Sequence, residues 1–504
     1  MSARGAKYRY QICDPNSREP VTDPHDIISA SNKIFECVLS ALCCMNEGGS
    51  KLTYRAFLKL KNGEHVSYQP GESISIYAHN SETDVSWVLQ RMGGDLQPDQ
   101  VVVLKQNSAP RRATGTGPPV EKAVTPRLLI RHFLEIHTPV SRKTVQLLAP
   151  HCTKDEEKHL LLKMGGRDGI KLYDELIKNT SATLMDLLAT FESCRPDLNT
   201  LLEVCPPFVA RQYSLIDECK EASPQELNFA FSNVDFPKDL SNHNMVIEDV
   251  TFKRYTRKTG VSTGYIHKLW EEKLTGDSFP RIFISFRTNL NGFAHPERVS
   301  DPLIMISAGT GIAPFIGFLQ QRRRFKQQSS HVGESWLFFG CRDPNYDLLF
   351  AEELAGFLED STLTHICLCF SRYSGDLPSK LPAFLRSKAI VPADCKYVQD
   401  CIASSCNSKK SVEDIADKLE SIQLDNSLLN DFAISVRMVQ LVGESGGHVR
   451  VCGDIHGMMR GVAEAWRDVF AQFKFADEED PKKAAESYLM QLRKDKRYVE
   501  DAWL

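Results

Sequence analysis

Hydrophobic and polar positions alternate along two separate stretches of the first three hundred residues. Between residues 51 and 80 the alternation surrounds turn residues at Gly63 and Pro70-Gly71, which is the pattern of antiparallel strands. From residue 126 to about residue 202 the apolar positions recur at helical spacing, and alternation returns at 209–216 and 226–236. The sequence therefore predicts a β-rich region that is interrupted by a helical insert.

A different pattern begins near Pro302. Short apolar runs alternate with amphipathic helical segments; the runs lie at 303–307, 334–340, 364–371 and 448–453, and the helical segments at 315–325, 349–358 and 458–470. This alternation is typical of a doubly wound parallel sheet. We therefore expect a chain of mixed class, α/β plus all-β. Its predicted parts are an N-terminal segment (1–45), a first β part (46–125), the helical insert (126–204), a second β part (205–299) and an α/β domain (300–504).

Composition narrows the classes of function. The 504 residues are 42% hydrophobic and 25% charged, which excludes disordered and fibrous proteins. Lys plus Arg (61) nearly balance Asp plus Glu (65), so neither a nucleic acid nor a membrane surface is an expected partner. The 15 cysteines contain no CxxC pair, so we expect no metal site and a reducing, cytoplasmic environment.

The clearest local motif is a glycine-rich turn between a predicted strand and a predicted helix. Gly309-Thr310-Gly311 follows the apolar run 303–307, and Pro314 stands at the start of the helix. Glycines let the backbone approach a pyrophosphate, and a helix N-terminus favours its negative charge. The third glycine of the usual dinucleotide fingerprint is absent, so a tight strand–helix turn without a ligand is the alternative.

Basic and hydroxyl side chains follow the next predicted strand. Ser371 ends the run 364–371 and Arg372 follows it, and Lys396, Tyr397 and Gln399 lie beyond a loop. A 2′-phosphate calls for such residues, whereas the 2′-hydroxyl of NAD usually meets a carboxylate. The pattern favours NADPH over NADH, and a solvated basic surface is the alternative.

Further candidates are two tetrapeptides, a cysteine and the end of the chain. The tetrapeptides are Arg211-Gln212-Tyr213-Ser214 and Gly260-Val261-Ser262-Thr263, which together could bind the pyrophosphate and ring of a flavin. Each has a simpler interpretation, since a tyrosine on a strand is usually part of the core. Cys452 lies near the end of another predicted strand, where a lone cysteine is more often a small buried hydrophobic residue. Trp503 could cover a planar cofactor or could anchor the terminus.

Taken in this order, the motifs resemble the ferredoxin–NADP reductase-like half of diflavin reductases, and most closely the branch that reactivates methionine synthase. The phrases that carry the resemblance are VSYQPGESISI, DVSWVLQRM, GTGIAPFIGFLQ, WLFFGCR, KYVQD and RYVEDAW. The resemblance covers roughly residues 30–504. It implies an FAD-binding β-barrel at 46–125 and 205–299, with the helical insert between its parts, and an NADP-binding α/β domain at 300–504.

The resemblance also assigns residues to cofactors. It implies flavin contacts at Arg211, Gln212, Tyr213, Ser214, Ala230, Phe231, Ser232, Phe236, Gly260, Val261, Ser262, Thr263 and Trp503. It implies NADP contacts at Gly309, Thr310, Gly311, Arg342, Ser371, Arg372, Lys396, Tyr397 and Gln399. In the family a serine, a cysteine and an aspartate assist hydride transfer, which here are Ser214, Cys452 and Asp501, and an aromatic residue shields the flavin, which here is Trp503.

The chain departs from the family pattern in three respects, one of which is the greater length of the stretches between Phe236 and Gly260 and between Arg372 and Lys396. Ile455 and Gly461 stand where the family usually has Ala and Asp, which puts one NADP contact in doubt. The family's flavodoxin-like domain has no counterpart in this sequence. FMN is therefore expected only if a partner or a longer product supplies it.

The resemblance implies an enzyme, an NADPH-dependent flavoprotein oxidoreductase with FAD as its bound cofactor. Hydride would pass from NADPH to FAD, and electrons would continue to an FMN protein and to the cobalamin of methionine synthase, in methionine biosynthesis. Two alternatives remain open. One is a reductase of the same family that serves a flavodoxin or a haem protein. The other is a catalytically weak partner that binds and stabilises methionine synthase.

Overall fold

The structure is a computed structural model of the 504-residue chain. It describes residues 8–12, 21, 33–61, 63–106, 122–218, 225–234, 246–247, 250–255, 259–276, 280–289, 291–328, 331–392, 395–403 and 431–503. The chain divides into two compact units, each made of several separate segments. Unit 1 consists of residues 1–37, 75–212 and 233–286, and unit 2 consists of residues 38–74, 213–232 and 287–504.

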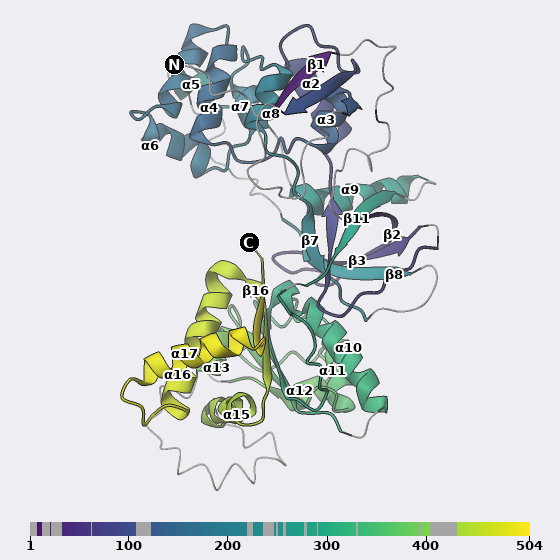
Figure 1. Cartoon of the computed structure of the whole chain (residues 1–504), viewed down its shortest axis with the longest axis vertical. Coiled ribbons are helices and arrows are strands. Elements are labelled where there is room, and N and C mark those ends of the chain that lie inside the picture. Colours follow the sequence, from purple (N-terminus) through teal and green to yellow (C-terminus); the bar gives the residue numbers. More distant parts are fainter. Residues whose placement is uncertain are drawn as a thin grey trace. The chain divides into compact units, whose positions relative to one another are not determined.

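The α/β part of unit 2 contains a six-stranded sheet with the order β15-β14-β13-β12-β16-β17 (Figure 1). The registers are parallel between all neighbouring strands of this sheet. The strands are β12 (Leu303–Ala308), β13 (Ser335–Cys341), β14 (His365–Phe370), β15 (Ala389–Ile390), β16 (His448–Asp454) and β17 (Tyr498–Trp503). The order reverses direction at β12, so the predicted doubly wound sheet is confirmed.

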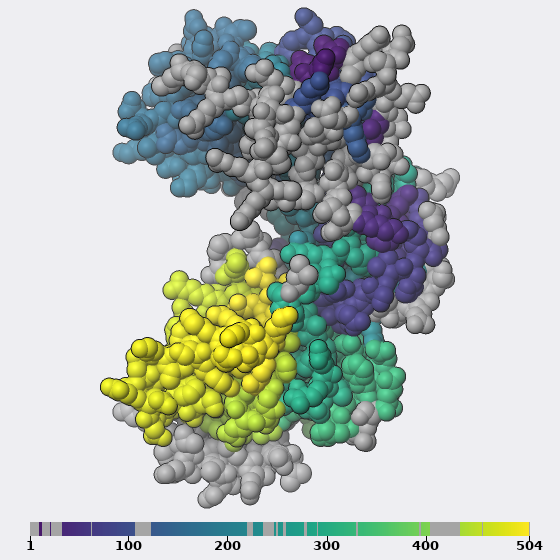
Figure 2. Space-filling view, in the orientation of Figure 1, coloured from purple at the N-terminus to yellow at the C-terminus, as the bar shows by residue number. Residues whose placement is uncertain are grey.

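Helices cover both faces of this sheet (Figure 1). One face packs against α10 (Ala313–Gln328), α11 (Ala351–Glu359) and α12 (Ala383–Lys388). The other packs against α13 (Val398–Ile402), α15 (Asp431–Gly443), α16 (Arg460–Phe473) and α17 (Pro481–Lys494). In the space-filling view, α16 and α17 form much of the yellow outer surface of this unit (Figure 2).

The sequence explains why these elements form. Strands β12 and β13 are buried on both faces, so their residues are apolar in continuous runs rather than in alternation. Helix α17 starts with Pro481 directly after Asp480, whose carboxylate accepts a hydrogen bond from the Lys483 amide at 3.1 Å. Proline and an N-cap aspartate are both favoured at a helix start, so the sequence sets this boundary locally.

A second six-stranded sheet has the order β7-β4-β11-β2-β3-β8. Its strands are β2 (Ile34–Cys44), β3 (Thr53–Leu60), β4 (Ser73–Tyr77), β7 (Arg211–Ser214), β8 (Glu226–Ser232) and β11 (Arg281–Arg287). Strands β3 and β8 pair antiparallel, with Thr53 opposite Ser232. No element is predicted from the sequence for the segment 1–45. In the structure, residues 34–44 of this segment form β2.

Unit 1 contains the predicted helical insert. The α-helices of the described residues of unit 1 are α2 (Glu82–Arg91), α3 (Pro126–His132), α4 (Arg142–Leu148), α5 (Asp155–Gly165), α6 (Ile170–Tyr173), α7 (Leu184–Thr190), α8 (Leu198–Val204) and α9 (Val261–Thr275), of which α3 to α8 lie in the insert. Short strands β1 (Tyr8–Ile12), β5 (Val102–Gln106) and β6 (Ala123–Val124) form one small sheet, and β9 (Val246–Ile247) pairs with β10 (Val250–Thr251). Apolar side chains from 85 to 252 form one core within this unit. The predicted loop at 107–120 lies outside the described residues.

Candidate active site

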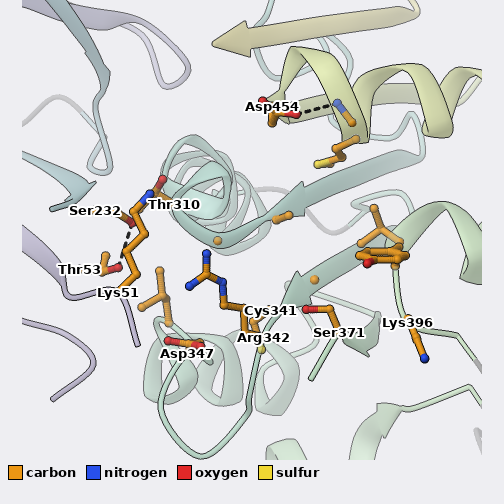
Figure 3. Close-up of a pocket in the computed structure, with 18 of the residues that line it drawn as sticks. Lys51, Thr53, Ser232, Thr310, Cys341, Arg342, Asp347, Ser371, Lys396 and Asp454 are labelled. Carbon is orange, nitrogen blue, oxygen red and sulfur yellow. Dashed lines mark hydrogen bonds between the residues drawn. The ribbon is translucent and has the colours of Figure 1, made fainter. Parts of the chain in front are cut away.

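Unit 2 has a cavity of about 620 Å³ at the carboxyl ends of its parallel strands (Figure 3). Strands β12, β13 and β16 contribute their last residues, and Ser371 directly follows β14. Open parallel sheets bind ligands at this edge, and the volume is in the usual range for a cofactor site. Among the lining residues are seven predicted NADP contacts: Gly309, Thr310, Arg342, Ser371, Lys396, Tyr397 and Gln399.

The predicted glycine-rich turn forms one wall of this cavity. Gly309 has φ +54°, in the left-handed region, and a Cβ placed there would have no atom within 4 Å. The glycine is therefore favoured by backbone conformation rather than by lack of space. The turn Gly309–Ile312 leads directly into α10, so backbone N–H groups at the start of a helix lie beside the cavity. Gly311 is buried within the turn and does not line the cavity.

Cationic side chains enter the cavity from different elements. Arg342 follows β13 and donates from Nη1 to Ser50 Oγ at 2.9 Å. Lys51 lies just before β3, and its pKa is lowered by burial and then by the charge of Arg342. In Figure 3 the Arg342 side chain points into the cavity, with Lys51 on one side of it and Ser371 and Lys396 on the other. Two cations beside one cavity repel each other, and a bound anion such as a pyrophosphate would relieve that repulsion.

The predicted 2′-phosphate residues are only partly brought together. Ser371, Lys396, Tyr397 and Gln399 all line the cavity. The Asp400 carboxylate accepts hydrogen bonds from the backbone amides of Lys396 (3.2 Å) and Tyr397 (2.9 Å), which fixes the start of α13. Arg372 is exposed and does not line the cavity, although its amide donates to the Arg342 carbonyl at 2.9 Å.

The three predicted hydride-transfer residues of unit 2 meet at one oxygen atom. Cys452 on β16 and Asp501 on β17 are Cα partners in the parallel register. Ser214 Oγ donates to Asp501 Oδ2 at 3.2 Å, and Cys452 Sγ donates to the same oxygen at 3.7 Å. Residues that are 287 positions apart in the chain thus form a polar cluster around one carboxylate.

Burial shifts the pKa values of this cluster upward. Burial raises the pKa of Asp501, while hydrogen bonds from Ser214 and Cys452 and the charge of Arg287 act in the opposite direction. Cys452 is fully buried, and burial together with the Asp501 charge raises its pKa well above the ordinary thiol value. The Cys452 thiol therefore stays protonated at neutral pH and acts as a hydrogen-bond donor.

The two aromatic candidates lie on strands of different sheets, Tyr213 on β7 and Trp503 on β17. The ring of Tyr213 packs against Phe229, at 4.8 Å between centroids, and against Phe231, at 6.1 Å. Trp503 is the Cα partner of Asp454 at the end of β17, and its side chain lies outside the described residues. Of the predicted flavin contacts on β8, Ala230 and Phe231 are buried and Ser232 lines the cavity, where its hydroxyl is 3.1 Å from Thr53 Oγ1. Phe236 lies outside the described residues.

The remaining flavin candidates belong to unit 1. Arg211 pairs with the buried Glu135, with 2.6 Å between Nη2 and Oε1, and Gln212 is exposed. Gly260 precedes helix α9, and a Cβ at Gly260 would lie only 2.6 Å from Thr263 Oγ1. Val261 is half-buried and Ser262 is buried. Within the part of the chain that the structure describes, the buried Thr263 hydroxyl has no hydrogen-bond partner.

These features fit the phosphate of a nucleotide. A helix N-terminus that begins after a glycine, together with an unpartnered hydroxyl, offers hydrogen-bond donors of the kind that an anion requires. Figure 3 likewise shows a lysine and an arginine at the cavity of unit 2, where a second nucleotide phosphate would find its partners.

Comparison with known proteins agrees with this geometry. The FAD binding domain family matches residues 50–246, and the oxidoreductase NAD-binding domain family matches residues 305–375. Methionine synthase reductase of Bos taurus is 31% identical over 95% of this chain and 63% of its own length. Methionine synthase reductase of Rattus norvegicus is 30% identical, over 87% of the chain and 56% of its own length. Over most of its length the chain is therefore similar to methionine synthase reductases, and it matches an FAD binding domain family and an oxidoreductase NAD-binding domain family in that order.

A further relative of the family is more distant. NADPH–cytochrome P450 reductase of Bos taurus is 24% identical over 93% of this chain and 58% of its own length. The chain spans about six-tenths of the length of the curated relatives that it matches. The two domain matches support FAD and NADPH as its cofactors. The sequence resemblance to the diflavin reductases, and to methionine synthase reductase among them, is thereby confirmed.

Several cavity residues were not identified from the sequence. They are Asn46, Lys51, Thr53, Asp347, Asp454, Gly457 and Met458. Asp454 accepts a hydrogen bond from the Gly457 amide at 2.7 Å, and Asp347 accepts one from Asn46 Nδ2 at 2.9 Å. A lysine in an alternating strand pattern is ordinarily solvent-exposed, so no local signal in the sequence identified Lys51 as a cavity residue. Only the antiparallel sheet and its contacts with the α/β part of the same unit bring Lys51 to the cavity.

Two further features of the described residues concern membrane-spanning helices and metal-binding groups of side chains. Within the described ranges, no helix is long and apolar enough to cross a membrane. The same ranges contain no group of three or more His, Cys, Asp or Glu side chains arranged to hold a metal ion.

The departure at Gly461 has a structural reason. Gly461 lies on α16, and a Cβ there would come within 3.2 Å of the Gln399 side chain. The missing side chain therefore leaves room for a cavity-lining residue. We expect Gly461→Ala to displace Gln399 and to raise the KM for NADPH about fivefold, equivalent to one neutral hydrogen bond of about 1 kcal/mol.

The alanine itself favours the helix, so the melting temperature of Gly461→Ala is expected to be unchanged or higher. Gly443→Ala is the matched control, because its Cβ would meet Lys474 at 3.3 Å outside the cavity. Steady-state kinetics with NADPH compare the two variants. An unchanged KM in Gly461→Ala would contradict the positioning of Gln399 by α16.

Proposed function

We propose that this chain is an NADPH-dependent flavoprotein oxidoreductase, which transfers hydride from NADPH to bound FAD. The electrons then pass to an FMN-binding protein and on to the cobalamin of methionine synthase, whose reductive reactivation is the proposed role. The observation that carries the proposal is the cluster of Ser214, Cys452 and Asp501. It lies in the same unit as a nucleotide-sized cavity whose lining includes Lys51, Arg342 and Lys396.

NADPH is proposed to bind in the cavity of unit 2. Lys51, Arg342 and the turn at Gly309 and Thr310 would hold the pyrophosphate, since all of them present positive charge or N–H donors to the same space. Ser371, Lys396 and Tyr397 would hold the 2′-phosphate, which distinguishes NADPH from NADH. Trp503 is proposed to cover the flavin until the nicotinamide arrives.

The FAD contacts proposed for unit 1 are Arg211, Gly260 and Thr263, and those proposed for unit 2 are Tyr213 and Ser214. When bound, the flavin supplies the hydride acceptor and a group that can release electrons one at a time. Asp501 holds the Ser214 hydroxyl and the Cys452 thiol in fixed orientations, because both donate to its Oδ2. Since the Cys452 thiol remains protonated, Asp501 is the one member of this cluster that carries a full charge when it is ionised.

The proposed electron acceptor follows from the names of the relatives. Two relatives that span more residues than this chain carry different names, one referring to methionine synthase and the other to cytochrome P450. The higher identity favours methionine synthase. A reductase for a flavodoxin or a haem protein, or a weakly active binding partner of methionine synthase, remains the alternative.

The test uses the purified full chain, its absorbance spectrum and three candidate acceptors. We expect a yellow protein with stoichiometric FAD whose absorbance is bleached anaerobically by NADPH. We further expect faster reoxidation by an FMN-binding flavodoxin with methionine synthase present than by a P450-type haem protein. A colourless protein that binds methionine synthase without bleaching would favour the binding partner. Preferential reduction of the haem protein would favour the other reductase.

A further inference from the structure

Two cysteines of the helical insert face each other in unit 1. Cys152 and Cys194 are Cα partners in an isolated antiparallel bridge, and both are free thiols. Next to them the Arg195 amide donates to the His151 carbonyl at 2.9 Å. Directly opposed residues of an antiparallel pair have Cα atoms about 4.5–5.5 Å apart, and a disulfide needs about 4.4–6.8 Å. The backbone thus already has the spacing of a disulfide.

The two thiols differ in exposure and in hydrogen bonding. Cys152 is 8% exposed and is followed by the exposed residues Thr153 and Lys154, whereas Cys194 is 1% exposed. Cys194 Sγ lies 3.6 Å from the Leu148 carbonyl oxygen, to which it can donate. A hydrogen bond from the Cys194 thiol lowers the pKa of Cys152, and the same contact followed by burial raises the pKa of Cys194. Cys152 is therefore the better nucleophile, and Cys194 retains its proton.

A third cysteine of the same core has a different environment. Cys205 is also buried, and burial alone raises its pKa to about 12. It is not a partner in the bridge that joins Cys152 and Cys194. Cys205 therefore serves as an internal comparison for a buried thiol of this insert.

We propose that Cys152 and Cys194 form a redox-active dithiol that a hydroperoxide oxidises to a disulfide. The Cys152 thiolate attacks the peroxide, which forms a sulfenic acid and releases hydroxide. The Cys194 sulfur then attacks the Cys152 sulfur, and the S–O bond breaks with loss of water. Two thiols thereby give up two electrons, and one hydrogen peroxide becomes two waters after the released proton is counted. Thiol–disulfide exchange with a dithiol reductant restores the pair.

The disulfide would join two separate parts of the insert. Cys152 precedes α5 and Cys194 lies between α7 and α8. A cross-link of this kind constrains the unfolded chain, so the oxidised protein is expected to melt at a higher temperature than the reduced protein. The shift is expected to disappear on reduction with dithiothreitol.

The full chain is treated with hydrogen peroxide, blocked with N-ethylmaleimide and digested without reduction for mass spectrometry. We expect a Cys152–Cys194 cross-linked peptide to appear before oxidation of Cys205. In Cys194→Ser, dimedone is expected to trap a sulfenic acid at Cys152, which the wild type does not accumulate. Cys205→Ser is the matched control and should leave the cross-link unchanged. Full alkylation of Cys152 and Cys194 after Cys205 is oxidised would overturn the proposal.

A second measurement separates proximity from reactivity. Phenylarsine oxide bridges two neighbouring thiols and requires no oxidant. We expect it to protect both cysteines from N-ethylmaleimide in the wild type. In Cys152→Ser and in Cys194→Ser, the one cysteine of the pair that remains should not be protected. Failure to protect the wild-type pair would contradict the proposed geometry. Neither experiment depends on bound flavin or on the reductase activity, so its failure would leave the proposed function untouched.

Discussion

Replacing Asp501 by Asn is expected to slow the reduction of bound FAD by NADPH about 10²-fold, the lower range of a lost acid–base or orienting group. Asp501 Oδ2 is the shared acceptor of the Ser214 hydroxyl at 3.2 Å and the Cys452 thiol at 3.7 Å. The amide removes the charge and leaves one weaker acceptor for two donors. Stopped-flow recording of flavin absorbance under anaerobic conditions measures the rate.

The pH dependence distinguishes this role from a general loss of structure. Burial raises the pKa of Asp501 above its ordinary value of 3.8, so the wild type loses the carboxylate as the pH falls through that raised value. The wild-type rate should fall there, and the Asp501→Asn rate should stay flat. A raised carboxyl pKa in the folded state costs stability at higher pH. The variant should therefore not melt earlier than the wild type at neutral pH.

Glu500→Gln is the matched control for Asp501→Asn. Glu500 is the adjacent residue on β17 and pairs with Arg493 at 3.1 Å, away from the polar cluster. Its replacement should leave the rate of flavin reduction within twofold of the wild type, since exposed ion pairs contribute about 0–1 kcal/mol to stability. If both variants lose rate equally, the loss comes from disturbance of strand β17 and not from removal of the Asp501 carboxylate.

Arg211→Ala is expected to weaken the binding of FAD on the order of 10- to 100-fold, as the loss of one charge-assisted hydrogen bond to a phosphate predicts. The same change leaves Glu135 without its partner, and the Glu135 side chain is only 9% exposed. The variant should therefore also unfold at a lower temperature, because an unpaired buried carboxylate is destabilising. Flavin content after gel filtration and thermal melting of the apoprotein measure the two effects separately.

Glu135→Gln separates flavin binding from the ion pair. This variant removes the carboxylate but keeps Arg211, so it should retain FAD. The double variant Arg211→Ala with Glu135→Gln should regain stability and still lose FAD. If the double variant retains FAD at the wild-type level, Arg211 serves only to pair with Glu135 and is not a flavin ligand.

The α/β part of the fold was predictable from the sequence because its signals are local. Strands β12 and β13 are continuous apolar runs, and the glycine turn at Gly309 marks the change from strand to helix. Strand β2 was not predicted. Its eleven residues, IFECVLSALCC, lack a regular alternation, because buried and half-buried positions follow one another irregularly. Residues of this kind become a strand through pairing with neighbours that the local sequence does not reveal.

The site was predictable where a motif carried it and not where tertiary structure assembles it. Thr310, Ser371 and Lys396 were identified from their places after strands, and all line the cavity. The meeting of Cys452 and Asp501 depends on the register of β16 with β17, which no local pattern specifies. Asp501 was named through family resemblance alone. Lys51 was missed, and Arg372 was expected at a cavity that it does not line.

The central claim is a direct transfer of hydride from the nicotinamide to the flavin of this chain. The most direct measurement is an anaerobic single turnover with NADPH carrying deuterium at either face of nicotinamide C4, followed by flavin absorbance and mass spectrometry of the nucleotide. We expect bleaching to slow for deuterium on one face only, with one NADP⁺ formed for each FAD reduced. Formation of NADP⁺ that retains deuterium from both faces equally, or no bleaching of bound FAD, would contradict the account.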